Sequence, residues 1–326
     1  MITIHRADGG RLVPVGSGAD ALAAVRDAVW IDMLNPTPEE ERAVEAAVGI
    51  DVPTREDMAE IETSSRLYAE EQALFLTASI LAQAREEGAD LAPVTFVLVG
   101  DWLVTIRYHQ PRAFALFAES AQRQDLGCAH GPGVLLALLE TVVDRMADIL
   151  EAETPKLDAL SRAIFEAHRP GGKGDRLAVV LQRIGRAEEL NGRVTESQSS
   201  IGRLLGFLAA ARADRAGARA IDGGRLKILQ RDLRSLVDYA AAHDKKIAFL
   251  LDATLGVINI RQSDIIKIFS VVAFVFLPPT LIASIYGMNF EVMPELRQWW
   301  GYPAALVAMV VSAVLPYLLF RRKGWL

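Results

Sequence analysis

The sequence predicts an α/β cytoplasmic domain followed by long stalk helices and two C-terminal transmembrane α-helices. The 326 residues are 51% hydrophobic and 23% charged, a composition too apolar for a disordered chain and too mixed for a chain that lies wholly in a membrane. Two uncharged windows of 23 residues each, 268–290 and 298–320, lie near the C-terminal end. The β-type runs lie in the first third of the chain, and helical patterns follow them.

Residues 1–125 are predicted to form the α/β domain. Runs of β-type residues predict strands over 29–33, 72–80, 94–99 and 102–108. Gly100 and Asp101 join the last two runs as a tight hairpin. A helix is expected to begin after Thr37, because threonine can cap a helix, proline suits the first turn, and the glutamates that follow favour the positive helix end.

Residues 126–224 are predicted to form a helical region. Two long amphipathic helices are expected over 133–168 and 175–215, and Pro155 should kink or split the first of them. The glycine-rich break between them, 169–174, lacks the spacing of a phosphate loop, and no strand precedes it. We interpret this break as a helix–helix turn.

The next stretch, Arg225–Leu277, contains no proline and a single glycine, Gly256. As one helix its 53 residues would be about 80 Å long. Residues 225–264 would then form a stalk that continues into the first transmembrane helix, 265–290, and would link the body mechanically to the membrane. The alternative is two shorter helices with a kink near Gly256 or residues 262–263.

Both uncharged windows are long enough to span a membrane, because about 20 apolar residues cross the ~30 Å hydrocarbon core. A pair of buried helices in a soluble core is the alternative, which their charged flanks and shared C-terminal position disfavour. The external loop 291–297 has a net charge of −1, whereas a basic tail, 321–326, follows the second span, 298–320. The positive-inside rule therefore predicts a multi-pass inner or plasma membrane protein with both termini in the cytoplasm.

The net charge of −6 is unevenly distributed. Residues 261–326 carry six basic and three acidic side chains, a net +3, which leaves −9 on residues 1–260. An acidic body repels phosphate backbones, so no nucleic acid partner is expected. The single cysteine, Cys128, excludes an internal disulfide and any CxxC site.

Several kinds of chemistry are missing from the sequence. It has no nucleotide motif, nucleophile triad or metal-ligand cluster, and its five histidines are scattered. No apolar segment typical of a cleavable secretory signal opens the chain. The sequence therefore predicts neither an enzyme nor an organic cofactor.

A line of small and hydroxylated residues recurs along the first window in steps of three or four. Its members are Ser270, Ala273, Leu277, Thr280, Ser284 and Gly287. Such a line can pack against another helix or face a water-filled path, and the pattern alone leaves both open. Pro278 and Pro279 free main-chain carbonyls in mid-span, which hydroxyls, water or neighbouring helices must satisfy. Two helices cannot enclose an ion path, so they either anchor the body or assemble with other subunits.

The outer end of this window carries Tyr286–Phe290 (YGMNF), followed by MPEL at 293–296. This sequence resembles the signature of the CorA family of magnesium transporters, which places Gly-Met-Asn at the outer end of the first of two C-terminal spans. Residues 249–255 and 276–284 resemble the stalk and first span of the family. The resemblance covers essentially the whole chain and is thin between residues 110 and 225.

The resemblance implies a funnel-shaped homopentamer in a lipid bilayer, with five first-span helices around a pore for divalent cations. Carried over by position, the pore-lining residues are Ile266, Phe269, Ala273, Leu277 and Thr280, and the selectivity filter is Gly287, Met288 and Asn289. Four of these eight residues, Ala273, Leu277, Thr280 and Gly287, also belong to the line of small and hydroxylated residues. The bulky Ile266 and Phe269 would form a hydrophobic constriction that excludes water.

The filter suits Mg²⁺ because this ion keeps most of its hydration water. Five neutral Asn289 side chains could accept hydrogen bonds from the hydrated ion, and Thr280 could supply a second ring. Gly287 allows close approach and an unusual backbone angle. Met288 is expected to pack sideways, since a thioether is a soft ligand. Glu291 and Glu295, at the external mouth, either concentrate cations or are ordinary solvated charges. 

The resemblance also implies that cytoplasmic Mg²⁺ binds between subunits and closes the pore, so that Mg²⁺ is both cargo and regulatory ligand. Asp252 corresponds to an acidic pore-entrance residue, and Asp232 and Asp238 are further regulatory candidates unless they only solubilise the surface. An inside-negative potential of 100 mV supplies about 4.6 kcal/mol for inward movement of a divalent ion. Co²⁺ and Ni²⁺ are possible further cargo. The alternatives are a Zn²⁺, Co²⁺ or Ni²⁺ transporter of the same superfamily and a non-conducting membrane-anchored sensor.

Overall fold

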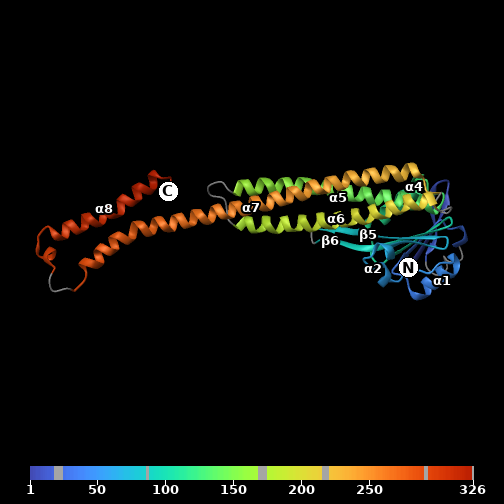
Figure 1. Ribbon diagram of the computed structural model, residues 1–326, viewed down its shortest axis with the longest axis horizontal. Helices are drawn as coiled ribbons and strands as arrows, with labels where there is room; N and C mark the ends of the chain where they lie inside the picture. Colours follow the sequence, from blue (N-terminus) through green and yellow to red (C-terminus); the bar gives the residue numbers. More distant parts are fainter. Residues whose placement is uncertain (18–24, 86–87, 168–174, 215–219, 290–292, 325–326) are drawn as a thin grey trace. The chain divides into compact units, whose positions relative to one another are not determined.

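The computed structural model describes residues 1–17, 25–85, 88–167, 175–214, 220–289 and 293–324 (Figure 1). The chain divides into two compact units. The first takes in Met1–Ala167 and Lys173–Leu251, and the second is built mainly from Asp252–Leu326.

One mixed β-sheet forms the centre of the first unit. Its strands are β1 (Ile2–Asp8), β2 (Arg11–Ser17), β3 (Trp30–Leu34), β4 (Leu67–Glu70), β5 (Ala73–Arg85), β6 (Gly88–Val99) and β7 (Trp102–Arg107). Their order across the sheet is β2-β1-β3-β7-β6-β5-β4. Only the β3–β7 pair is parallel among these described strands, and the other neighbours run antiparallel.

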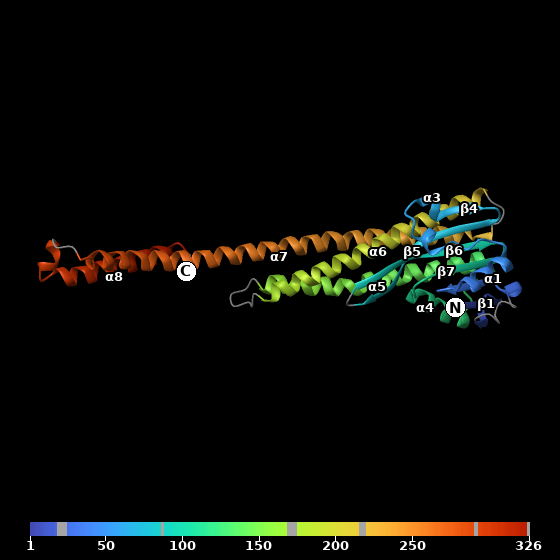
Figure 2. The same cartoon turned by 90° about the horizontal axis from the view of Figure 1, so that it is seen from below.

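Helices cover both faces of this sheet. They are α1 (Pro38–Val48), α2 (Arg55–Ala59), α3 (Thr63–Arg66), α4 (Arg112–Arg123), α5 (Gly131–Ala167) and α6 (Asp175–Asp214). Successive strand residues point to opposite faces. In β7, Leu103 joins the core that α4, α5 and α6 complete, whereas Val104 joins the core beside α1 and α2. The first unit is therefore a three-layer α/β/α arrangement, which Figures 1 and 2 show from two sides.

The four strands that the sequence predicts are present as β3, β5, β6 and β7, with shifted ends. Gly100 in the β6–β7 hairpin has a φ of 56°, which lies in the left-handed region that glycine adopts readily. Thr37 caps α1, since its hydroxyl accepts from the Glu40 N–H while the Glu40 carboxylate accepts from the Thr37 N–H. Strands β1, β2 and β4 and helix α4 are additions to the predicted elements.

A buried polar network crosses from β3 to β7 on the face that α4 covers. Arg107 donates from Nε to Oδ1 of Asp32 at 2.9 Å and from Nη2 to Oδ2 at 2.7 Å. The Thr105 hydroxyl donates to the same Oδ1 at 2.8 Å, and Trp30 Nε1 donates to Thr105 at 3.0 Å. All four side chains are buried. Both buried charges are therefore satisfied by hydrogen bonds, as a buried ion pair requires.

Helices α5 and α6 lie alongside the first part of α7 (Gly223–Tyr286) in both views (Figures 1 and 2). Pro155 lies inside α5 without splitting it. Helix α6 is anchored to β5, because the Ser197 hydroxyl donates to the Ser79 carbonyl at 2.8 Å and the Ser79 N–H donates to the Ser200 hydroxyl at 3.0 Å. These bonds fix the helical bundle on the sheet.

Helix α7 is a single helix of 64 residues, so the alternative of two shorter helices is not realised. Its C-terminal part belongs to the second unit, together with the short 3₁₀ helix η3 (Pro294–Arg297) and α8 (Gly301–Arg322). The rings of Phe274 in α7 and Phe320 in α8 lie 5.7 Å apart.

Both α7 and α8 are long and apolar enough to cross a membrane, with mean hydropathy of 2.2 and 2.1 in their most apolar stretches. These stretches are almost entirely unburied within the chain, unlike the core helix of a soluble protein. The fold class that the sequence predicts is therefore confirmed: an α/β domain, a long helix and two apolar C-terminal helices.

Candidate functional site

The candidate site is the membrane part of α7 and the tripeptide that follows it. The helix ends at Tyr286, and two hydrogen bonds close its last turn: the Gly287 N–H donates to the Ala283 carbonyl at 2.9 Å and the Met288 N–H to the Ile285 carbonyl at 3.3 Å. Asn289 follows outside the helix and is exposed. The predicted filter therefore lies at a helix C-terminus, where the helix dipole has its negative, cation-attracting end.

Gly287 lies where a side chain would be in tight contact with the preceding turn. A Cβ atom at this position would lie 3.1 Å from the Ala283 carbonyl oxygen and 3.7 Å from that of Ser284. Its φ lies outside the left-handed region, so the expectation of an unusual backbone angle is wrong. A side chain at this position would therefore require the last helical turn to shift by a few tenths of an ångström.

All five residues predicted to line a pore lie on exposed positions of one continuous helix. Ile266, Phe269 and Leu277 are 64%, 72% and 67% exposed, and Ala273 and Thr280 are exposed as well. Steps of three and four residues place them on one face of α7. Because no described part of the same chain covers this face, it is available to other copies of the chain or to lipid.

Thr280 has a defined hydrogen-bonding role. Its hydroxyl donates to the Phe276 carbonyl oxygen at 2.7 Å. A hydroxyl has one proton and two lone pairs, so the side chain can only accept hydrogen bonds from any further partner. Water molecules around a cation point their protons outward, and the lone pairs of Thr280 have the polarity that accepts from such water.

Pro278 and Pro279 lie in the turn that contains this bond, and α7 continues through both. Because proline has no N–H, the carbonyls of Phe274 and Val275 lack the usual donors four residues later. The prolines thus create polar main-chain positions within an otherwise apolar span.

Of the predicted mouth and regulatory residues, the structure places only some. Glu291 lies outside the described residues, and of Glu295 the structure describes only the backbone, in η3. Asp252 and Asp238 are exposed on α7, and Asp232 lies 3.5 Å from Arg231. Their roles stay predictions.

Carboxylates of α5 lie near Asp232. Burial raises the pKa of Asp144, and the negative charges of Glu140, Asp148 and Asp232 raise it further. Asp232 therefore belongs to an acidic region that involves two helices, which the sequence pattern of α7 does not reveal. Across the described residues, no group of three His, Cys, Asp or Glu side chains is arranged to hold a metal ion.

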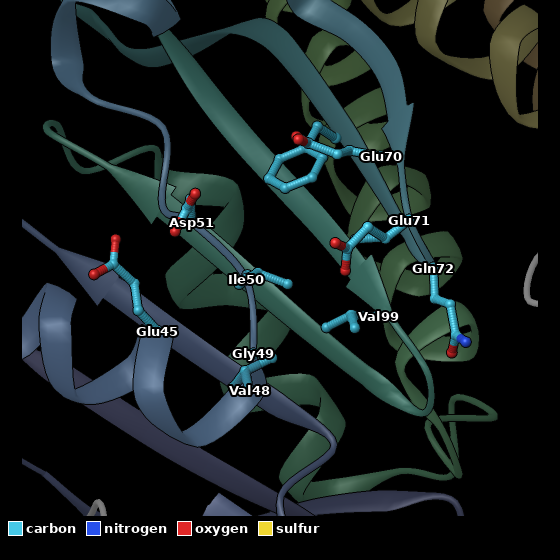
Figure 3. Close-up of a pocket in the computed structure, with 11 residues that line it drawn as sticks. Glu45, Val48, Gly49, Ile50, Asp51, Glu70, Glu71, Gln72 and Val99 are labelled. Atoms are coloured by element: carbon cyan, nitrogen blue, oxygen red, sulfur yellow. The ribbon is translucent and has the colours of Figure 1, made fainter.

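A second acidic feature lies in the α/β domain, where a cavity of about 580 Å³ opens between the end of α1 and the β4–β5 turn. Figure 3 shows Glu45 and Asp51 on one side of it and Glu70 and Glu71 on the other. Glu45 also accepts a hydrogen bond from the Val52 N–H at 3.0 Å. Part of the acidic excess of the body gathers here from segments that are distant in sequence.

The fold and this site define a membrane protein with two C-terminal spans, in which one helix belongs to both the soluble body and the first span. The sequence model of the CorA-like Mg²⁺ transporter protein matches residues 26–322, and the chain belongs to this family. The family consists of transporters, not enzymes.

The relatives agree with this assignment. The chain is 37% identical to the magnesium transport protein CorA of Salmonella typhimurium and 36% identical to that of Escherichia coli K12, in each case over 303 residues and 92% of both chains. The fold is similar to that of the CorA magnesium transporter from Methanocaldococcus jannaschii, with a TM-score of 0.78, 19% identity and coverage of 100% and 99% of the two chains.

Two further structures share the fold alone. The full-length CmaX protein matches with a TM-score of 0.71 at 16% identity, over 100% of this chain and 98% of that one. The ZntB cytoplasmic domain from Vibrio parahaemolyticus matches with a TM-score of 0.54 at 10% identity, over 80% of this chain and 98% of that domain.

Proposed function

We propose that five copies of this chain assemble into a channel that conducts Mg²⁺ into the cytoplasm across the inner or plasma membrane. The observation that carries this proposal is the exposed face of α7, which runs from Ile266 to Thr280 and ends at the Gly287–Asn289 tripeptide. Two spans cannot surround a water-filled path, so such a face needs further copies of the same helix. The relatives named magnesium transport protein CorA support Mg²⁺ as the cargo.

The proposed filter binds the hydrated ion through acceptors only. Asn289 presents a side-chain carbonyl at the negative end of α7, and Thr280 presents lone pairs two turns earlier. Mg²⁺ dehydrates reluctantly, so a ring of neutral acceptors can hold its waters without removing them. Met288 is not assigned as a ligand, because a thioether suits softer metals. Co²⁺ and Ni²⁺ are further candidate cargo.

The driving force is the membrane potential. Both termini and the acidic body lie in the cytoplasm in this proposal, because Arg321, Arg322 and Lys323 follow the second span. A potential of 100 mV, negative inside, supplies about 4.6 kcal/mol for each divalent ion. Glu291 and Glu295 at the external mouth would raise the local cation concentration.

Closure is assigned to the cytoplasmic side. Ile266 and Phe269 would form an apolar constriction at the inner end of the span, which stops conduction by excluding water. Cytoplasmic Mg²⁺ bound between subunits, with Asp252, Asp232 and Asp238 as candidate ligands, would hold this constriction closed. Since α7 contributes to both units, an effect on its first part can reach these two residues along one helix.

A flux assay in liposomes tests the proposal. The purified chain should carry Mg²⁺ inward under an inside-negative potential, and Co²⁺, Ni²⁺ and Zn²⁺ should be offered in competition. If Zn²⁺ is carried in preference to Mg²⁺, the chain is a zinc transporter of the same fold. If no divalent ion crosses, the two spans are an anchor for a sensor.

The filter has its own test. Asn289→Ala should reduce Mg²⁺ flux or its selectivity by about tenfold or more, because one whole ring of acceptors is lost. Ser312→Ala is the matched control, since that hydroxyl only donates to the Met309 carbonyl within α8. Unchanged flux and selectivity in Asn289→Ala would remove Asn289 from the filter.

A further inference from the structure

A polar cluster joins α5 to α7 within the helical bundle of the first unit. Thr154 of α5 meets Tyr239 and His243, which lie one turn apart on α7. The oxygen of the Thr154 hydroxyl is 2.7 Å from the Tyr239 hydroxyl and 3.1 Å from Nε2 of His243. The Tyr239 and His243 rings also pack on each other, with centroids 4.9 Å apart. One threonine hydroxyl thus bridges two side chains of the stalk helix.

The His243 side of this cluster is buried and mostly apolar, whereas Tyr239 is 38% exposed. His243 is only 6% exposed. A narrow crevice beside it is lined by Leu150 and Leu157 of α5, Leu190 of α6 and Ile247 of α7. A positive charge on the imidazole would therefore have little contact with water, and burial lowers the pKa of His243 below its usual value.

Three helices place charged or polar groups around His243. From α5, Glu153 lines the same crevice and raises the pKa, although it is paired with Lys156. From α7, Lys246 lowers the pKa and is itself bonded to Asp158 of α5.

The third helix, α6, places a polar side chain beside this crevice that forms hydrogen bonds with α7. Helix α6 contributes Asn191, whose amide donates to the Ala240 carbonyl at 3.1 Å and to Asp244 at 3.3 Å. No described carboxylate pairs directly with the imidazole of His243.

The hydrogen bonds of the cluster depend on the proton at His243. With a neutral ring whose Nε2 is unprotonated, Thr154 donates to Nε2 and accepts from Tyr239. When Nε2 gains a proton from the cytoplasm, it becomes a donor, and the Thr154 proton must turn to the Leu150 carbonyl, 3.3 Å away. In the hydrogen bond between Thr154 of α5 and His243 of α7, the donor and the acceptor then exchange roles. The imidazole also carries a positive charge next to apolar side chains.

We infer that the contact of His243 with Thr154 and Tyr239 is a proton-sensitive latch, which holds α7 against α5 at neutral pH and releases it when the cytoplasm becomes acidic. Because α7 continues into the first span, release would change the conduction of the proposed channel. This last step rests on the proposed function, whereas the release itself does not.

The lowered pKa of His243 decides whether the latch is lost at low or at high pH. The pKa of His243 in the folded chain lies below its ordinary value of 6.5, so the unfolded or released state binds the proton more readily. The latch is therefore intact above pH 6.5 and is lost as the pH falls through the lower pKa of the folded state.

Hydrogen exchange of the full-length protein tests the release directly. Amides of residues 236–250, corrected for the intrinsic effect of pH, should lose protection by about threefold or more between pH 7.5 and pH 5. His243→Gln should remove this loss, because its amide cannot take up a proton. His109→Gln is the matched control, since burial also lowers the pKa of His109 but its Nε2 contacts the Ile80 carbonyl of β5, outside the cluster of Thr154, Tyr239 and His243.

Thr154→Ala gives a second test that keeps His243 in place. Without the hydroxyl the contact is missing at every pH, so the segment should already be less protected than in the wild type at pH 7.5 and should lose less protection between pH 7.5 and pH 5. An unchanged pH dependence in His243→Gln, or equal protection of the wild-type segment at both pH values, would overturn the latch.

Flux in liposomes completes the experiment. Lowering the pH on the cytoplasmic side should change wild-type Mg²⁺ flux by about twofold or more, and His243→Gln should respond less. If exchange shows the release but flux does not respond, the link to conduction is wrong while the latch stands. If the wild type carries no Mg²⁺ at any pH, the proposed function fails and the exchange result is unaffected.

Discussion

The hydroxyl of Thr280 donates a hydrogen bond to the main-chain carbonyl of Phe276, 2.7 Å away, in the turn of α7 that contains Pro278 and Pro279. The bond uses the only proton of the side chain and directs its lone pairs to other partners. In a pore formed by several copies of α7, these lone pairs would form a ring of acceptors about two turns before Asn289.

Thr280→Val should therefore lower Mg²⁺ flux by roughly threefold to tenfold, because valine keeps the shape of threonine but has no oxygen to accept from a hydrated ion. Thr280→Ser keeps the hydroxyl and should conduct like the wild type. The measurement is dye-reported Mg²⁺ uptake by liposomes under a fixed potential. Wild-type uptake in Thr280→Val would show that the hydroxyl does not contact the ion.

Gly287→Ala should displace the filter. The added Cβ would lie 3.1 Å from the Ala283 carbonyl oxygen, so the turn that positions Asn289 must shift by a few tenths of an ångström. We expect Mg²⁺ flux or selectivity to fall by about tenfold. Gly256→Ala is the matched control, because nothing beyond the backbone of its own helix lies within 4 Å of its Cβ position. That change should keep the flux and stabilise α7 by about 0.5–1 kcal/mol. Equal fluxes in the two variants would contradict the steric argument.

Asp32→Ala should destabilise the α/β domain by about 3–5 kcal/mol, because it leaves the buried guanidinium of Arg107 without its carboxylate. The comparison is Glu119→Ala, which removes an exposed ion pair with Arg123 and should cost no more than about 1 kcal/mol. Denaturant unfolding followed by tryptophan fluorescence reports both, since Trp30 is part of the same network. Similar losses of unfolding free energy in the two variants would show that the buried Asp32–Arg107 pair contributes no more to stability than the exposed one.

His5 should make the stability of the first unit dependent on pH. Burial lowers its pKa to about 4, while the charge of Asp32 opposes this shift. The folded chain therefore binds the proton less readily than the unfolded chain, and stability present above pH 6.5 is lost as the pH falls towards 4.

His5→Phe should flatten this dependence and keep the stacking on Trp30, whose ring lies 4.5 Å away. The measurement is the unfolding midpoint at several pH values between 4 and 7. A smaller slope should remain, because burial also lowers the pKa values of His109 and His243. If the slope is the same in His5→Phe and in the wild type, His5 is not its source.

Local signals explain the elements that sequence reasoning finds. The Thr37 cap, the Gly100 turn and the two apolar windows each depend on a few adjacent residues or on length alone, and the structure contains the corresponding elements. The β1–β2 hairpin could also have been predicted from the sequence, because Gly9 and Gly10 separate two runs of strand-forming residues. In the structure both glycines have positive φ. Helix α4 could also have been predicted, because Phe114 and Phe117 are spaced three residues apart and both lie on its buried face.

Ala273, Leu277 and Thr280 could be placed from the helical period, because they recur on one face of a single helix. Ile266 and Phe269 were placed only by the resemblance to the CorA family. The sequence by itself thus determined the two apolar spans and the line of residues that recurs along the first, whereas the structure decided that α7 is one continuous helix and that this face is exposed. Only the tertiary structure decided which side chains from distant segments meet: Asp32 with Arg107, Thr154 with His243, and the four carboxylates around the cavity at α1. The physical reason is that helix and strand periods act over a few residues, whereas contacts between segments 75 or 89 residues apart depend on how whole layers pack.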